Sequence, residues 1–391
     1  MIKYIPFLLA FLSLMISSGG SAESSVLMDA GKYIRVSILL LSVLISLILL
    51  FSYKRKIYYN KYLLLFLVFC FLSSIWSYDY ITAIAKSFEY TVFVLASYAV
   101  IYGASLKKTI DNTKFSILIV VSFIFISSIY FNLITHGAPF LYSPVATSLG
   151  FSIVIINLYL IINYKLHLNM NYKLFLLVFV AMLLTILIGS RTSLLLVVVS
   201  FLWLLPKKNK LLSTLVLTMA SIISLFLIAI FPNLIELIFR GQDIETLYAL
   251  SGRVSNWTHA IQMFQEQPII GYGYYSGVRH SATFSYDAYA GYEFSTLDNT
   301  YLDLLISVGL FGSILLLIFI YSGLSKLKKI LKNYKYHNDE YYILLFAYTF
   351  VLLTLVRTFF APGIAFAHWN LLPFLVVLIL SERIIYVKKL Q

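Results

Sequence analysis

Residues 211–231 read LLSTLVLTMASIISLFLIAIF, a run without a single charged side chain. A helix needs about 20 apolar residues to cross the hydrocarbon of a bilayer. Comparable runs recur along the whole chain, and they are apolar on all sides, unlike the alternating strands of a membrane β-barrel. The sequence therefore predicts an all-α, polytopic helical membrane protein.

The overall composition agrees with this class. Of the 391 residues, 61% are hydrophobic and 12% are charged, about half the charged fraction of a soluble domain. The net charge of +13 could indicate nucleic-acid binding. However, Lys and Arg lie in short clusters between apolar runs, as the positive-inside rule requires, so we expect no nucleic-acid partner. The single cysteine, Cys70, excludes a disulfide or CxxC metal site within the chain.

About twelve transmembrane helices are predicted, with ends placed to within about four residues. Clusters of Lys and Arg follow every even-numbered span, from Lys54-Arg55-Lys56 to Lys388-Lys389, and Lys3 precedes the first span. Because cytoplasmic loops carry such an excess of cations, both termini are predicted to be cytoplasmic. The spans cover residues 4–19, 34–52, 62–77, 80–103, 114–134, 145–163, 173–188, 191–206, 211–231, 298–323, 341–360 and 365–386.

The N-terminal segment has two interpretations. Lys3, the apolar run 4–16 and the small residues 17–22 have the pattern of a cleavable signal peptide. A short first span has the same pattern. We favour a retained span, because the alternation of basic clusters is then regular.

The chain divides into three parts: residues 1–231 with nine spans, the polar and aromatic segment 232–297, and residues 298–391 with three spans. The charge pattern places segment 232–297 on the non-cytoplasmic side, as one long loop. Helical spacing from Ser251 to Phe264 predicts an amphipathic helix within it, lying on the membrane surface.

Tyrosines crowd the second half of this loop, among them Tyr272 and Tyr274. Their rings suit stacking on sugars, but tyrosine also accumulates at the membrane interface. The sequence leaves both interpretations open.

Ionisable side chains inside spans are costly and usually mark a functional cavity. The predicted topology places one set of them near the non-cytoplasmic side. Lys86 and Glu89, three residues apart on one helical face, could neutralise each other, and Arg357 near a helix end could extend to lipid headgroups. The set comprises Lys86, Glu89, Arg191, Asp303 and Arg357, with His368 at the start of the last span.

Arg191 has the strongest functional signal of this set. It follows a glycine break, Ile188-Gly189-Ser190, between two hydrophobic helices, and Ser190 or Thr192 could cap the second helix. A cation at a helix N-terminus opposes the helix dipole and so indicates an anionic partner. The planar guanidinium suits bidentate contact with phosphate.

Three segments in this order together resemble the O-antigen ligase and O-antigen polymerase superfamily of bacterial envelope glycosyltransferases. The resemblance covers roughly residues 170–325, while the N-terminal spans match only in number and hydrophobicity. The segments are GSRTS at 189–193, the stretch from SGR at 251–253 to PIIGYG at 268–273, and DNTYL at 298–302 continued by GLFG at 309–312.

The resemblance implies a GT-C-like membrane enzyme of the bacterial inner membrane with its active site facing the periplasm. Such enzymes use a glycan on undecaprenyl pyrophosphate, need no metal or other cofactor, and invert the anomeric carbon. Membrane lipids are further partners, and a polymerase also implies a chain-length regulator. Arg191 matches the family's pyrophosphate-binding arginine, and Arg253 and Arg279 are further candidate clamps. The remaining candidate substrate-binding residues are Lys86, Asn299, Arg357, Tyr272 and Tyr274.

The catalytic base is less well defined. Asp298 occupies the position where ligases usually have histidine, and a carboxylate can accept or orient the proton of the acceptor hydroxyl. His280, His259 or Glu293 could supply the base instead, and Asp298 and Asn299 could simply cap the following helix. The resemblance implies that polymerases tolerate a residue other than histidine here more readily than ligases do. Asp298 therefore favours a polymerase.

The leading hypothesis is an O-antigen, or related surface polysaccharide, polymerase that joins lipid-linked repeat units. The alternative within the family is the ligase that transfers finished polymer to lipid A-core; an oligosaccharyltransferase usually carries a larger C-terminal periplasmic region. A flippase for the same lipid-linked units is the alternative from another class. Transporters place charges near the midplane between repeated halves, whereas these charges lie near one face. A non-catalytic scaffold leaves the arginines unexplained.

Overall fold

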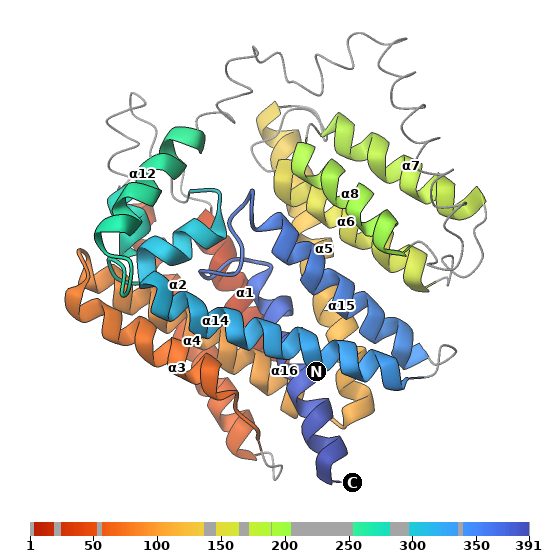
Figure 1. Ribbon diagram of the computed structural model, residues 1–391, viewed down its shortest axis with the longest axis horizontal. Helices are drawn as coiled ribbons and strands as arrows, with labels where there is room; N and C mark the ends of the chain where they lie inside the picture. Colours follow the sequence, from red (N-terminus) through yellow and green to blue (C-terminus); the bar gives the residue numbers. More distant parts are fainter. Residues whose placement is uncertain are drawn as a thin grey trace. The chain divides into compact units, whose positions relative to one another are not determined.

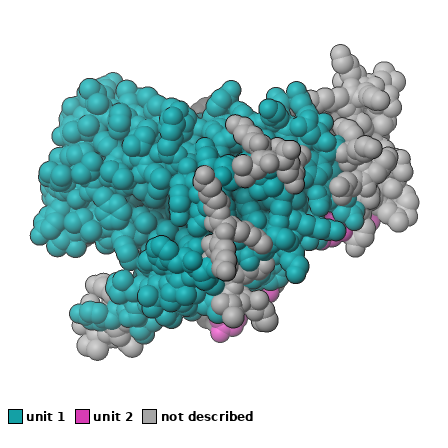
Figure 2. All heavy atoms as spheres, turned by 90° about the horizontal axis from the view of Figure 1, so that it is seen from below, with its two compact units in different colours: residues 1–120, 253–391 teal, residues 121–252 magenta. Residues whose placement is uncertain are grey.

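The computed structural model describes residues 4–18, 25–52, 57–136, 146–163, 172–188, 190–204, 253–281, 297–334 and 339–390. Every regular element within these ranges is helical. The chain forms two compact units, residues 1–120 with 253–391 (unit 1) and residues 121–252 (unit 2). The two separate stretches of unit 1 form one continuous body in Figure 2.

Unit 1 is a bundle in which α4 (Tyr80–Tyr102), α14 (Thr300–Asn333) and α16 (Leu371–Leu390) pack centrally (Figure 1). Around α4 lie α1, α2 and α3, and around α14 lie α3, α12 and α15. From Leu371 to Ile384 every residue of α16 is buried, so this helix forms the core of the unit. The surrounding helices are α1 (Ile5–Ser18), α2 (Ser25–Ser52), α3 (Lys61–Leu72), the start of α5 (Leu106–His136), α12 (Arg253–Glu266) and α15 (Asp339–Arg357).

Unit 2 contains three helices that pack on one another: α6 (Ala146–Asn163), α7 (Tyr172–Leu187) and α8 (Arg191–Leu204). Gly150 permits the close approach of α6 to α8, because a Cβ there would lie 2.4 Å from Ser193 Oγ. Asn157 Nδ2 donates a hydrogen bond to Leu177 O at 2.6 Å and ties α6 to α7.

The helical membrane class is supported by five described helices that are long and apolar enough to cross a bilayer: Tyr33–Ser52, Tyr80–Tyr102, Leu106–Tyr130, Thr300–Asn333 and Asp339–Arg357. Shorter apolar helices cover four more of the predicted spans. Residues 211–231 lie outside the described ranges, so the count of twelve stays a prediction.

Two span boundaries differ from the sequence expectation. The span predicted over 341–360 ends at Arg357, and the one predicted over 365–386 begins as a helix only at Leu371. The ten residues 361–370 are irregular although they are apolar and mostly buried. Pro362 and Gly363 disfavour a continuous helix here, and hydropathy alone does not reveal such a break.

Helix α14 is interrupted at Gly309, whose φ of 61° and ψ of −167° are non-helical. The backbone groups left free by this break pair with the loop that follows α12. Leu310 N donates to Pro268 O at 2.8 Å, Phe311 N donates to Ile269 O at 3.1 Å, and Tyr272 N donates to Ile306 O at 2.9 Å. Irregular backbone at membrane depth requires such satisfaction of its polar groups. The motifs PIIGYG and GLFG are therefore two halves of one backbone junction.

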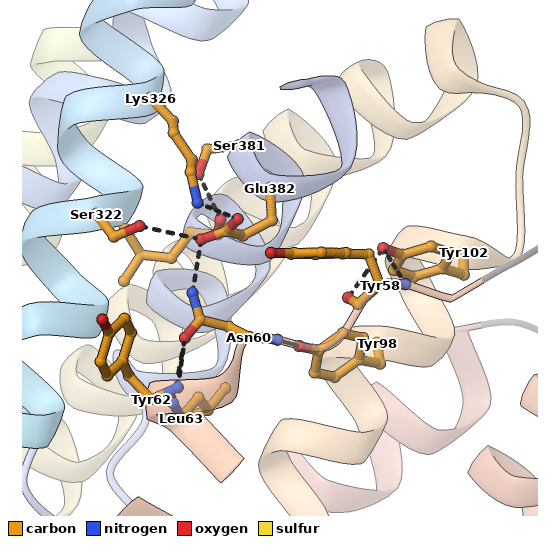
Figure 3. A network of polar contacts seen from close by, with 11 residues as sticks. Tyr58, Asn60, Tyr62, Leu63, Tyr98, Tyr102, Ser322, Lys326, Ser381 and Glu382 are labelled. Atoms are coloured by element: carbon orange, nitrogen blue, oxygen red, sulfur yellow. Dashed lines mark hydrogen bonds and ion pairs between the residues drawn. The ribbon is translucent and has the colours of Figure 1, made fainter. Parts of the chain in front are cut away.

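A network of polar contacts joins the C-terminal parts of α14 and α16 to the start of α3 (Figure 3). The buried carboxylate of Glu382 on α16 accepts from Asn60 Nδ2 at 2.7 Å and pairs with Lys326 of α14. Next to it, Arg383 donates to Ala104 O and Thr109 Oγ1, both at 2.8 Å. Buried charges are tolerated only when paired in this way, so the network fixes α16 against α3, α5 and α14.

Candidate functional site

The start of α14 carries the third sequence motif. Asn299 is the N-cap of this helix, because its side-chain oxygen accepts from Tyr301 N at 3.1 Å and from Leu302 N at 3.2 Å. The capping interpretation is thus confirmed for Asn299. Asp298 precedes the cap with a φ of 52°, in the left-handed region that Asp adopts more readily than most residues, and its side chain is half-buried.

Two contacts hold the residue before Asp298. Trp257 Nε1 of α12 donates to Leu297 O at 2.8 Å, and Leu297 N donates to Asp303 Oδ1 at 3.1 Å. The loop helix and the first turn of α14 therefore position Asp298 together. The predicted helix from Ser251 to Phe264 is confirmed as α12, Arg253–Glu266, and it packs on α14.

Asp303 is the ionisable residue that the sequence places inside a span without a partner. It is 1% exposed, and its Oδ2 has no hydrogen-bond partner in the part of the chain that the structure describes. One turn further on, Ser307 Oγ is likewise buried and unsatisfied there. An unsatisfied buried polar group is costly, so these two atoms mark a strained polar position near the start of α14.

Arg357 ends α15 and is 2% exposed. Its Nη1 donates to Pro362 O at 2.9 Å, and its guanidinium lies 5.2 Å from the ring centroid of Trp369. The idea that Arg357 extends to lipid headgroups is therefore wrong, because the irregular segment 361–370 folds over it. Asp298 and His368 both lie within electrostatic reach of this buried cation.

The candidate site is defined here as Asp298, Asp303, Arg357 and His368. The four residues come from the start of α14, the end of α15 and the segment before α16. They bring carboxylates and a buried cation into one region, and such perturbed ionisable groups often mark functional sites. Sequence reasoning noticed Asp303, Arg357 and His368 as ionisable groups near one membrane face and Asp298 as a motif residue, but it could not show that Asp298 lies within electrostatic reach of Arg357.

An aromatic patch on unit 1 consists of exposed Tyr78 and half-buried Tyr272 and His280. The His280 ring lies 4.9 Å from that of Tyr78 and 5.8 Å from that of Tyr272. Tyr272 also donates its hydroxyl to Glu266 Oε2 at 2.6 Å. Partly exposed rings in such an arrangement can stack on sugars or lie at a membrane interface. His280 is thus among aromatic rings, whereas Asp298 is the candidate base that lies within electrostatic reach of Arg357.

Tyr274 differs from its neighbours because it is fully buried. Its backbone N–H donates to Ser73 Oγ at 2.9 Å, and its hydroxyl donates to Ala365 O at 2.7 Å. The ring packs α3 against segment 361–370 and leaves no exposed face for a sugar. Its described contacts make Tyr274 a packing residue.

Arg279 is paired at the N-terminus of α4. It donates to Asp79 Oδ2 at 2.6 Å and to Thr82 Oγ1 at 2.8 Å. Hydrogen bonds from Thr82 and the charge of Arg279 hold the pKa of Asp79 below its usual range. The side chain of Arg279 is 56% exposed and so remains accessible. Its charge, however, is already balanced by the carboxylate of Asp79.

Lys86 and Glu89 pair as the sequence allowed, with Lys86 Nζ 3.0 Å from Glu89 Oε2. Sequence reasoning missed the second cation, Arg35 of α2, which contacts Glu89 Oε1. Arg35 lies at the start of its predicted span, 34–52. It stands 54 positions before Glu89 in the sequence, so no local spacing reveals the contact. The three residues are named here the Glu89 cluster.

Arg191 and Arg253 begin α8 and α12, respectively. Their side chains and the whole of Glu293 lie outside what the structure describes, so their roles stay predictions. The cap predicted beside Arg191 is confirmed, because Ser190 Oγ accepts from Ser193 N at 3.4 Å. Arg191 therefore stands at a capped helix start in unit 2, whereas the candidate site belongs to unit 1.

The fold and the charge pairs define a helical membrane protein with an ionisable site at one end of its core helices. Residues 174–317 match the family model Wzy_C, described as O-antigen ligase. No curated protein and no solved structure matches the chain. This match agrees with the resemblance of roughly residues 170–325 to the O-antigen polymerase and ligase superfamily that the three motifs indicate.

Proposed function

We propose that the protein is an O-antigen, or related surface polysaccharide, polymerase of the bacterial inner membrane. It joins repeat units carried on undecaprenyl pyrophosphate at the periplasmic face. The observation that carries this proposal is that the start of α14 lies against the end of α15, where Thr300 N donates to Thr358 O at 2.9 Å. This brings Asp298 within electrostatic reach of buried Arg357.

The reaction needs three tasks from the chain. Asp298 accepts the proton of the attacking sugar hydroxyl while its oxygen bonds to the anomeric carbon of the donor. The bond from that carbon to pyrophosphate breaks, and undecaprenyl pyrophosphate leaves with the electron pair. Arg191 and Arg253 stabilise its charge by bidentate contacts, without a metal. Trp257 and Asp303 act as positioning residues, because they hold Leu297 beside the base.

The ligase and flippase alternatives make different demands on the site. Asp298 stands where ligases usually have histidine, which favours polymerisation over transfer to lipid A-core. A flippase requires charged groups near the midplane of its helices. The candidate site instead lies at helix ends, which favours an enzyme.

Lipopolysaccharide gels test the proposal directly in a strain that lacks this gene. Core carrying a single repeat unit is expected, because ligation continues when polymerisation stops. Core without any repeat unit, beside accumulated lipid-linked polymer, identifies a ligase instead. An unchanged ladder contradicts both activities on O-antigen, and wild-type complementation restores the long chains in either positive case.

Asp298→Asn tests the base. The amide keeps the size of the side chain but cannot accept the proton, so we expect transfer to fall by about a hundredfold. Transfer is measured as repeat units joined by purified protein across pH 5 to 9 (a chosen range that brackets about neutral pH).

Asn299→Asp is the matched control for Asp298→Asn. A carboxylate caps a helix as well as an amide does, so this variant keeps the fold and adds a charge beside the base. A full rate in Asp298→Asn at every pH would show that Asp298 only orders the helix start.

A further inference from the structure

The Glu89 cluster carries more positive than negative charge. Arg35 and Lys86 both contact the carboxylate of Glu89, which is 3% exposed. The cations remain 22% and 24% exposed, respectively. Two formal positive charges therefore face one buried negative charge, and both cations stay within reach of a ligand.

Within the residues that the structure describes, the contacts of Arg35 and Lys86 include no second carboxylate. Lys86 Nζ lies 5.0 Å from the ring centroid of Tyr275, which supplies a π face and no formal charge. Arg279, the next cation, is already paired with Asp79. A net positive site is what a phosphate ester requires.

The cluster lies along an apolar span. Lys86 is six residues inside α4, which corresponds to about 9 Å from the start of the helix. Exposed apolar side chains flank it on both helices: Ile34 and Val36 on α2, and Ile81 and Ile84 on α4. A cation pair in such surroundings is costly unless an anion joins it. An anion with an attached hydrocarbon chain matches both the charge and the flanking surface.

We propose that Arg35 and Lys86 bind the phosphate end of a polyprenyl phosphate lipid at the α2 and α4 surface. Glu89 orients both cations, and the exposed apolar side chains contact the lipid chain. This proposal rests on the proposed function, because that reaction consumes and releases a polyprenyl pyrophosphate. It assigns a lipid-facing binding place to N-terminal helices outside the family-matched residues 174–317.

Binding is measured on the full chain in neutral phosphatidylcholine nanodiscs by native mass spectrometry with undecaprenyl pyrophosphate as the probe. Arg35→Gln and Lys86→Gln are each expected to weaken binding by about tenfold or more, because each removes a charge-assisted contact. Lys86→Arg keeps the charge and should stay within about threefold of the wild type. Lys329→Gln on the exposed face of α14 is the matched control and should leave binding unchanged.

Two further probes separate the possible ligands. Phosphatidylglycerol tests a general anionic lipid, and inorganic pyrophosphate tests the headgroup alone. Equal sensitivity of phosphatidylglycerol binding to Arg35→Gln, or pyrophosphate binding as tight as that of the lipid, would overturn the proposal. Unchanged undecaprenyl pyrophosphate binding in both glutamine variants overturns it as well.

Folding and catalysis are followed separately. Thermal unfolding identifies glutamine variants that fail to fold. In that case Arg35→Lys and Lys86→Arg replace them in the binding measurement. Both keep the charge of the cluster and should keep lipid binding. Joining of repeat units is measured in the same samples. If repeat units are joined but neither glutamine variant changes lipid binding, this inference alone is rejected. If the lipid binds normally but no repeat units are joined, the proposed function is rejected.

Discussion

Arg191→Ala is expected to lower glycan transfer by about a hundredfold or more, with the protein still inserted in the membrane. Arg191 begins α8 directly after the Ser190 cap, where the positive end of the helix dipole disfavours a cation. An anion at this position would offset that cost, and in the proposed function the pyrophosphate of the donor is that anion. Arg253 is the first residue of α12, so Arg253→Ala should have a comparable effect.

The measurement is the rate at which membranes containing each variant join lipid-linked repeat units, normalised to the amount of protein. Arg191→Lys should recover only part of the rate, because lysine keeps the charge but loses the bidentate fork. Lys108→Ala, an exposed cation near the start of α5, removes the same charge elsewhere and should leave the rate unchanged. Normal product from both alanine variants would rule out the pyrophosphate-clamp role.

Apolar runs predicted most of the helices, because hydrophobic length is a local property of the sequence. The predicted spans 80–103, 145–163 and 173–188 correspond closely to α4, α6 and α7. Segment 361–370 shows where this reasoning fails. Its residues are buried, so hydropathy treats them as part of a helix although tertiary packing holds them irregular.

The candidate site shows the same division between local and long-range information. The Asn299 cap and the pairing of Lys86 with Glu89 follow from short spacings along a helix. The contact of Arg35 with Glu89 and the electrostatic interaction of Asp298 with Arg357 join distant parts of the chain. Single residues and periodicity carry no information about such pairs, so only the folded structure reveals them.

The junction at Gly309 leads to the second large effect. Gly309→Ala is expected to destabilise the protein by about 3 kcal/mol or more and to abolish transfer. A Cβ at Gly309 would lie 2.3 Å from Ile269 O, and the φ of 61° already disfavours any side chain. The docked loop must therefore move, which breaks the bonds from Leu310 and Phe311 to Pro268 and Ile269.

The consequence reaches the candidate site through the same loop. Residues 268–272 connect α12 to the break in α14, and α12 holds Leu297 through Trp257. Displacing this loop should therefore misplace Asp298, so activity is lost even where the protein still folds. Thermal unfolding in detergent and joining of repeat units measure the two effects separately. Ser325→Ala on the exposed face of the same helix is the control and should change neither. A fully stable and active Gly309→Ala protein would show that the break in α14 does not support the site.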